Sequence, residues 1–481
     1  MSLTKTFLFA RTRRIAGICI AFALSGALIC APALAFADVR TSDIVAGLSV
    51  EQRGLTASDS PNIVAERSIL VSEDGTVYFE RDADAQCHIA SVTKVMTSLV
   101  ALQYGDPQNT QITISDTAAS IGESSAQLKS GDTMTLETAL KALMLASGND
   151  AAQGIAESMG EDIKRQLQES GDQNVPESSY DVFIYAMNKK AAELGMTNSL
   201  FANPHGLDFD NYDADMHSSA RDVATMCAEA MKNDVFREIV KTPKTTIQVT
   251  RANKSVDIKL ESTDVLLGEL EGACGIKTGY TEKAGECFAG AVERDGKLLY
   301  AIVLGSNSES QRFTDAKTLD EWFYGNSVSY PLVHSSEKTS YDVDGQSVSV
   351  PVVANVAHSG WIDRTFKATL SDPNASVDVF ALEGNVSQEF QFDSVSGDVV
   401  PGQKVGTVTF YQHNEVIATA DVVAAEYCAA PNVIEGIGIW WDRLWRGFNG
   451  DVTVAQSSVV NKTPLIYGPN AETDSNTATL E

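Results

Sequence analysis

Cysteine, histidine and basic residues are all scarce in this chain of 481 residues. Seven Cys and six His are present, and 36 Lys and Arg face 64 Asp and Glu, which gives a net charge of −28. The Cys are too widely spread for a disulfide framework and none has metal-ligand spacing, so we expect no metal site and no cofactor. Cys274 and Cys287 flank one expected hairpin, and we interpret them as unpaired and buried. The acidic surface argues against a nucleic-acid partner.

The first residues have the features of a signal peptide. Four basic residues (Lys5, Arg11, Arg13 and Arg14) precede an apolar run over 15–30 and the small-x-small sequence Ala35-Phe36-Ala37. The sequence predicts cleavage after Ala37 and export of a mature chain with a net charge of −32. A retained membrane anchor is the alternative, which the short apolar run disfavours.

Hydrophobic periodicity predicts an α/β sandwich followed by a smaller all-β domain. The polar lead-in over 38–60 is expected to have little structure of its own. After it, the pattern is a strand pair, several helices, a run of strands and a closing helix over 311–323. We expect a surface excursion over 161–179. Short alternating runs then predict the separate β domain. The expected parts are 1–37, a signal peptide; 38–328, the catalytic domain; 329–428, the β domain; 429–450, an amphipathic helix; and 451–481, a disordered tail.

Ser91 and Lys94 stand three residues apart at the start of an expected helix. That spacing puts their Cβ atoms about 5–6 Å apart on one face, within reach of each other. A Ser hydroxyl needs such a neighbour to become a nucleophile, and a Lys accepts its proton only when burial and nearby positive charge lower its pKa. Taken alone, this motif is weak evidence for catalysis.

Two further motifs follow in chain order, Ser147-Gly148-Asn149 between two expected helices and Lys277-Thr278-Gly279 on an expected strand. The ordered set is typical of penicillin-binding proteins and class A β-lactamases. Acyl transfer from an amide would use Ser91 as nucleophile, Lys94 as base and Ser147 as proton relay, with Asn149 holding either the substrate or Lys94.

The third motif is suited to a substrate that ends in a carboxylate. Lys277 supplies positive charge that favours this carboxylate and helps to keep Lys94 deprotonated, and Thr278 can donate a hydrogen bond to it. Gly279 lets the substrate backbone approach the strand closely.

Longer stretches resemble the D-alanyl-D-alanine carboxypeptidase family of low-molecular-mass penicillin-binding proteins. The resemblance covers 63–321 closely and includes the residues around the three motifs and the segments 203–208 and 217–222. It implies a penicillin-binding protein/β-lactamase-like fold, in which an antiparallel sheet is flanked by helices. It also implies an oxyanion hole from the backbone N–H groups of Ser91 and Tyr280, and a carboxylate contact from Arg312. His205 and His217 match the family's motifs, and we interpret both as structural.

The leading hypothesis is therefore a serine D-Ala-D-Ala carboxypeptidase that trims peptidoglycan stem peptides ending in D-Ala-D-Ala and is acylated by β-lactams. A DD-endopeptidase acting on cross-links shares every motif. A β-lactamase would need an efficient deacylating base, and no convincing Glu-x-x-x-Asn loop follows Asn149. A catalytically silent wall-binding protein is disfavoured by the intact Ser91, Lys94, Ser147 and Lys277.

An amphipathic helix is expected near the C-terminus. One helical face over 434–448 carries large apolar residues, and at about 22 Å the segment is too short to span a bilayer. We favour binding to a membrane surface over docking on the β domain, in line with family members anchored this way. The predicted location is thus extracytoplasmic, at the outer face of the cytoplasmic membrane. The apolar residues of that face are Ile434, Ile437, Trp441, Leu444, Trp445 and Phe448.

Overall fold

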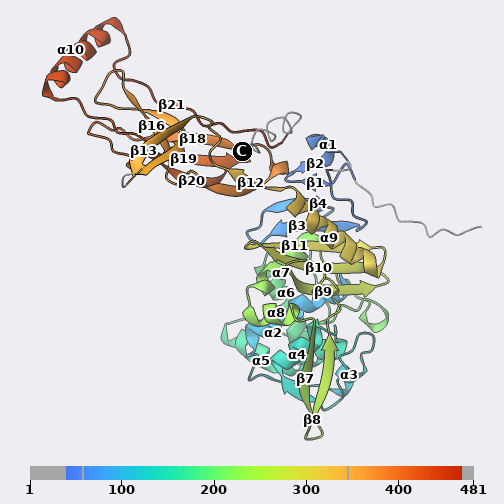
Figure 1. Ribbon diagram of the computed structural model, residues 1–481. Helices are drawn as coiled ribbons and strands as arrows, with labels where there is room; N and C mark the ends of the chain where they lie inside the picture. The colour runs from blue at the N-terminus through green and yellow to red at the C-terminus, as the bar shows by residue number, and fades with distance from the viewer. Residues whose placement is uncertain (1–39, 57–58, 344–345, 468–481) are drawn as a thin grey trace, which may run out of the picture. The chain divides into compact units, whose positions relative to one another are not determined.

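The computed structural model describes residues 40–56, 59–343 and 346–467. The expected signal peptide falls outside these residues. A seven-stranded antiparallel sheet organises the first part of the chain, with strand order β2-β1-β4-β3-β11-β10-β9 (Figure 1). Its strands are β1 (Ile44–Val45), β2 (Leu48–Ser49), β3 (Arg67–Ser72), β4 (Val77–Arg81), β9 (Ala273–Thr281), β10 (Gly285–Arg294) and β11 (Lys297–Ser306).

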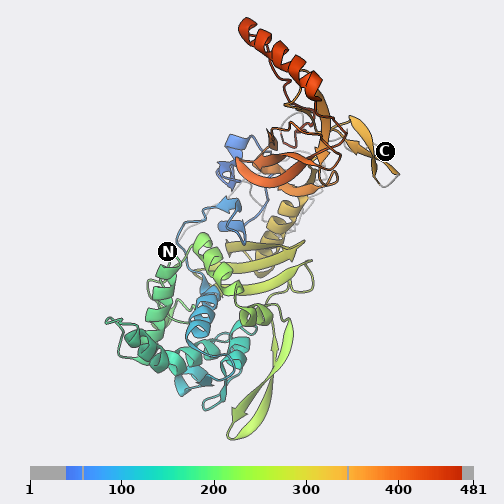
Figure 2. The same ribbon diagram turned by 90° about the vertical axis from the view of Figure 1, so that its left-hand side faces the viewer.

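Successive side chains of the central strands enter two different cores. In β3, Ile69 packs into the core on one face of the sheet and Leu70 into the core on the other, and in β11 Ile302 and Val303 divide in the same way. This alternation is the period-2 pattern of a strand covered on both faces. Helix α9 (Glu309–Gly325) covers one face (Figure 2). The predicted α/β sandwich is therefore confirmed.

The opposite face carries most of the helices. They are η1 (Ala90–Thr93), α2 (Lys94–Tyr104), α3 (Asp116–Ser120), α4 (Leu136–Met144), α5 (Asn149–Glu169), α6 (Ser179–Glu193), α7 (Ala220–Met231) and α8 (Asp234–Val240). A smaller four-stranded sheet lies beside them and contains β5 (Gln111–Thr113), β6 (Thr133–Thr135), β7 (Lys244–Arg251) and β8 (Lys254–Glu261). Short polar residues cap several of these helices, as at Ser219, whose hydroxyl accepts a hydrogen bond from the Asp222 backbone N–H at 3.2 Å.

Short antiparallel strands follow α9 and confirm the all-β texture expected after it. They are β12 (Ser327–Pro331), β13 (Lys338–Val343), β14 (Gln346–Pro351), β15 (Ala354–Ala357), β16 (Thr365–Leu370), β17 (Ser376–Phe380), β18 (Ser387–Phe392), β19 (Lys404–Gln412) and β20 (Glu415–Ala424). A 17-residue helix, α10 (Val433–Asn449), comes next.

Three expectations of irregular structure were wrong. The lead-in contains β1, β2 and α1 (Val50–Arg53). The excursion over 161–179 begins as the last turns of α5, because Ile163 and Leu167 are buried on one face of that helix. The part of the expected tail that the structure describes, 451–467, includes a strand. Its strand β21 (Ser458–Val459) pairs with β15.

The five cysteines of the described chain are all free thiols. Cys227, Cys287 and Cys428 are buried, and Cys87 and Cys274 are partly buried. Burial raises the pKa of the Cys87 thiol to about 11 and that of Cys274 to about 12. The expectation that Cys274 and Cys287 are unpaired is confirmed.

Candidate active site

The nucleophile candidate lies at a junction between two helices. Ser91 belongs to η1, which runs directly into α2 at Lys94. This arrangement places the Lys94 Nζ atom 2.6 Å from the Ser91 Oγ atom. The Lys94 amine and the Ser91 hydroxyl are therefore within hydrogen-bonding distance, as their spacing in the sequence predicted.

Lys94 is completely buried and surrounded by hydrogen-bonding oxygens. Its Nζ atom lies 2.7 Å from Asn149 Oδ1, 3.1 Å from the His205 carbonyl oxygen and 3.4 Å from Ser147 Oγ. Burial, and next the charge of Lys277, hold the pKa of Lys94 well below its usual value. A neutral amine has two N–H donors and one lone pair, so it can donate to the two carbonyl oxygens and accept from the Ser91 hydroxyl.

The second motif is held by its own turn and by the neighbouring loop. Ser147 has φ 54°, in the left-handed region, which turns the chain sharply between α4 and α5. Asn149 begins α5; its side-chain amide donates to the Gly122 carbonyl and its backbone N–H donates to the Ser124 carbonyl. Asn149 thus contacts Lys94 directly, which supports the second of its two expected roles.

Asp150 fixes the loop that faces this turn. Its buried carboxylate accepts hydrogen bonds from the Ser125 hydroxyl (2.6 Å) and from the backbone N–H groups of Ala126 (3.1 Å), Leu128 (3.1 Å) and Ala151 (2.8 Å). No local sequence signal announces this role, because the donors lie up to 25 residues away.

The third motif lies on β9, the last strand of the seven-stranded sheet. Lys277 is buried, and its ammonium donates to the Thr278 carbonyl oxygen at 2.9 Å. Burial, and next the charge of Arg312, lower the pKa of Lys277 to about 7. The Thr278 and Thr263 hydroxyl oxygens are 2.6 Å apart. Because of its burial and the nearby Arg312, Lys277 loses its charge more readily than an exposed lysine.

Gly279 allows β9 to lie close to the backbone of the segment that carries Ser91, a contact that the sequence did not indicate. A Cβ atom here would lie 2.8 Å from the Ile89 carbonyl oxygen and 3.1 Å from the Ser91 nitrogen. Glycine is therefore needed for β9 to pack against the turn that carries Ser91, apart from any approach by substrate.

Arg312 reaches the same region from α9. Its Nη1 atom donates to the Gly279 carbonyl oxygen at 3.3 Å and also contacts Glu286 Oε2, while Nη2 is 3.5 Å from Glu309 Oε1. The guanidinium is almost fully buried and its Nε atom has no hydrogen-bond partner among the described residues. Arg312 thus reaches the same region as Gly279, with both of its Nη atoms held by neighbouring residues.

These groups surround one cleft of about 640 Å³. Of the nine site residues predicted from the sequence, Lys94 and Lys277 lie beneath its surface. The other seven line it, and they are Ser91, Ser147, Asn149, Thr278, Gly279, Tyr280 and Arg312. Nucleophile, candidate base, hydroxyl relay and cations thus meet in one site suited to acyl transfer.

His205 has a structural role, as expected. Its Nδ1 atom accepts a hydrogen bond from the Leu207 N–H at 3.2 Å, and its ring packs edge-on against Tyr212. Burial, and next the charge of Lys94, lower its pKa to about 3. The imidazole is therefore neutral at physiological pH, and the contact of His205 with Lys94 is made by its backbone carbonyl oxygen.

Known proteins resemble the chain in both sequence and structure. A family model described as D-alanyl-D-alanine carboxypeptidase matches residues 54–168 and 172–308. The D-alanyl-D-alanine carboxypeptidase DacF of Bacillus subtilis is 27% identical over 372 residues, covering 75% of this chain and 85% of that protein.

Two further similarities come from Streptomyces. The D-alanyl-D-alanine carboxypeptidase of Streptomyces sp. strain K15 is 30% identical over 286 residues, covering 58% of this chain and 93% of that protein. The solved structure of a cysteine-to-alanine mutant of Streptomyces K15 DD-transpeptidase superimposes with a TM-score of 0.50 at 28% identity, covering 55% of this chain and all of that one. Because the family model matches more than half of the sequence, the chain belongs to the D-alanyl-D-alanine carboxypeptidase family of serine-type, penicillin-binding hydrolases.

Proposed function

We propose that Ser91 attacks the carbonyl between the two terminal D-alanines of a peptidoglycan stem peptide and becomes acylated. The observation that carries the proposal is the 2.6 Å distance from Ser91 Oγ to Lys94 Nζ, together with a burial that favours the neutral amine. Lys94 takes the hydroxyl proton, and Ser147 passes a proton to the leaving D-alanine amine. Water then hydrolyses the acyl-enzyme and restores Ser91.

The remaining site residues hold the substrate during these steps. The backbone N–H groups of Ser91 and Tyr280 form the oxyanion hole, where loss of one donor typically costs about 10²- to 10³-fold in rate. The terminal carboxylate is bound by Thr278 and Arg312 and attracted by the charge of Lys277. Asn149 holds Lys94 in place through the 2.7 Å contact.

Intact mass spectrometry tests this assignment. The protein lacking residues 1–37 is incubated with benzylpenicillin, beside its Ser91→Ala variant. We expect a stable adduct in the first protein and none in the variant. Rapid drug hydrolysis without an adduct would indicate a β-lactamase, and neither adduct nor hydrolysis would indicate a silent wall-binding protein.

We further propose that the protein is exported and that α10 attaches it to a membrane surface. Its apolar residues are 38–83% exposed, from Leu444 to Ile434, so they are not covered by the β domain. Arg443 holds the helix by donating to the Ser359, Trp361 and Thr453 carbonyl oxygens. Within the part of the chain that the structure describes, no helix is long and apolar enough to cross a bilayer.

Binding to lipid vesicles tests the role of α10. The protein lacking residues 1–37 is sedimented with phosphatidylcholine–phosphatidylglycerol vesicles, beside Trp445→Glu and the matched control Val416→Glu. Val416 is 61% exposed on the β19–β20 hairpin, and Trp445 is 62% exposed. We expect only Trp445→Glu to weaken binding. Equal binding by all three proteins would contradict the proposal.

A further inference from the structure

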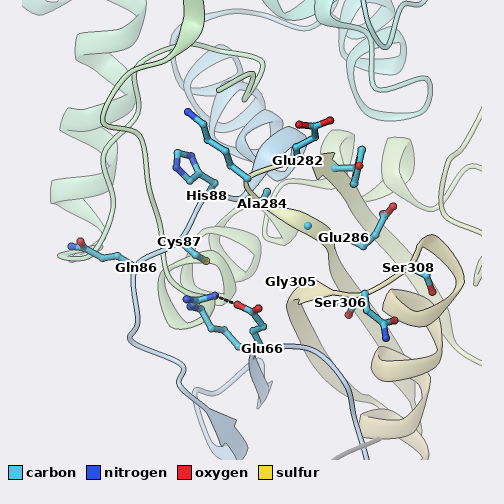
Figure 3. Close-up of a pocket in the computed structure, with 15 residues that line it drawn as sticks. Glu66, Gln86, Cys87, His88, Glu282, Ala284, Glu286, Gly305, Ser306 and Ser308 are labelled. Carbon is cyan, nitrogen blue, oxygen red and sulfur yellow. Dashed lines mark hydrogen bonds and ion pairs between the residues drawn. The ribbon is translucent and has the colours of Figure 1, made fainter. Parts of the chain in front are cut away.

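A second cavity of about 740 Å³ lies at the end of the central sheet, beside the turn between β9 and β10. We call it the turn cavity. Figure 3 shows Gln86 and Cys87 on one side and Ser306 and Ser308 on the opposite side, with Glu66 at one end and Glu282 at the other. None of these residues belongs to the three sequence motifs of the active-site cleft.

The lining of the turn cavity is polar, and several of its groups are available to a ligand. Gln86 and Asn307 are exposed, and their side-chain amides make no hydrogen bond with the described residues. Arg67 forms an ion pair with Glu66 at 2.9 Å, but its buried Nε atom has no hydrogen-bond partner in the described chain. Such groups suit a ligand rich in amide and hydroxyl groups, because buried donors without partners are costly.

The turn cavity adjoins the active-site cleft. Tyr280, Glu282 and Lys283 line both. Because β9 is the last strand of its sheet, its outer edge can pair with an extended peptide. A substrate whose terminal carboxylate lies at Thr278 and whose reacting carbonyl lies at Tyr280 must run antiparallel to β9, towards Lys283.

The length of an extended peptide fits this path. An extended chain advances about 3.4 Å per residue, so a five-residue stem is about 17 Å long, whereas the three steps from Thr278 to the end of β9 at Thr281 span about 10 Å. A five-residue stem bound from its carboxyl end would therefore reach the β9–β10 turn with its amino-terminal residues. The chain beyond that point, including its attached sugar, would enter the turn cavity.

We infer that the turn cavity is a second substrate subsite, which takes the polar amino-terminal end of the stem peptide and its attached sugar. This inference rests on the proposed function, since it fixes the direction of the peptide on β9. The subsite contributes to the recognition of long natural substrates. It contributes nothing to the hydrolysis of short peptides that end before the turn.

Two substrates of different length test the inference. The values of kcat/KM for release of D-alanine are compared for a disaccharide pentapeptide and for N-acetylated L-Lys-D-Ala-D-Ala. Asn307→Trp fills the turn cavity from one wall and Gln86→Trp fills it from the other. Asn174→Trp, at another exposed Asn in the loop between α5 and α6, is the matched control.

We expect each cavity variant to lower kcat/KM about tenfold for the disaccharide pentapeptide, the equivalent of one or two lost hydrogen bonds. The short peptide should be hydrolysed at an unchanged rate, and the control should change neither value. Unchanged hydrolysis of the long substrate, or an equal fall for both substrates, would overturn the inference. Failure of the proposed function would look different, because the unaltered protein would then fail to hydrolyse the short peptide.

Discussion

Replacing Asp150 by Asn tests how much the stability of the turn at Ser147 and of the loop facing it depends on one buried carboxylate. The carboxylate accepts four hydrogen bonds, and three of the donors are backbone N–H groups. An Asn side chain keeps one acceptor oxygen and turns an NH₂ group towards the remaining donors. About two charge-assisted hydrogen bonds are lost, each worth about 1.5–3 kcal/mol, so the free energy of unfolding should fall by about 3–6 kcal/mol.

The assay is urea unfolding, followed by the loss of acylation with a fluorescent penicillin. The matched control is Asp162→Asn on the same helix, since Asp162 is exposed and forms a single ion pair with Arg165 at 2.7 Å. An exposed pair of this kind is worth at most about 1 kcal/mol. Equal stability of the two variants would refute the reasoning.

The Asp150→Asn variant also has a catalytic readout. The negative charge of Asp150 favours the protonated form of Lys94, opposing the effects of burial and of Lys277 on its pKa. Removing that charge should lower the pKa of Lys94 further. The acylation rate should then begin its rise at a lower pH than in the unaltered protein. A shift to higher pH would contradict this electrostatic argument.

Contacts in and near the cleft lead to three more predictions. The pKa of Lys277 is lowered to about 7, so its charge is lost as the pH rises through this value. The KM for a peptide with a free terminal carboxylate should therefore rise above pH 7. The KM for the corresponding C-terminal amide should not change. Gly206→Ala should destabilise the protein and slow acylation, because the added Cβ atom would lie 1.9 Å from the Ala90 carbonyl oxygen. The control Gly195→Ala is also at positive φ but has open space around it, so it should lose only stability, by about 1–2 kcal/mol. Glu286→Gln should lower the KM for carboxylate-terminated peptides, because Glu286 competes with the substrate for Arg312. Glu261→Gln, on the β7–β8 hairpin, is the control. An unchanged KM for Glu286→Gln would contradict this prediction.

The proximity of the residues within each motif could be predicted from the sequence, because it depends on local geometry. Ser91 and Lys94 face each other through helical spacing alone, and Ser147-Gly148-Asn149 needed only a turn between two helices. The contacts that tune these groups could not be predicted. The His205 carbonyl at Lys94 and Glu286 at Arg312 come from segments that are distant in the sequence and meet only in the folded chain.

The errors in the fold also have physical causes. The polar residues after Glu161 suggested a loop, but the buried residues Met159, Ile163 and Leu167 recur every four positions and continue α5. The C-terminal tail has no such periodicity. It is held by backbone pairing with β15 and by the side chain of Asn461, which donates to the Leu332 carbonyl oxygen at 2.9 Å. Polar composition alone does not reveal contacts of this kind.

The burial of the free thiols affects how readily the protein is oxidised. Oxidants attack the thiolate, and burial keeps these sulfur atoms protonated at neutral pH. The five cysteines of the described residues are therefore poor substrates for oxidation. An oxidising environment therefore offers few reactive sulfur atoms there through which two copies could become covalently joined.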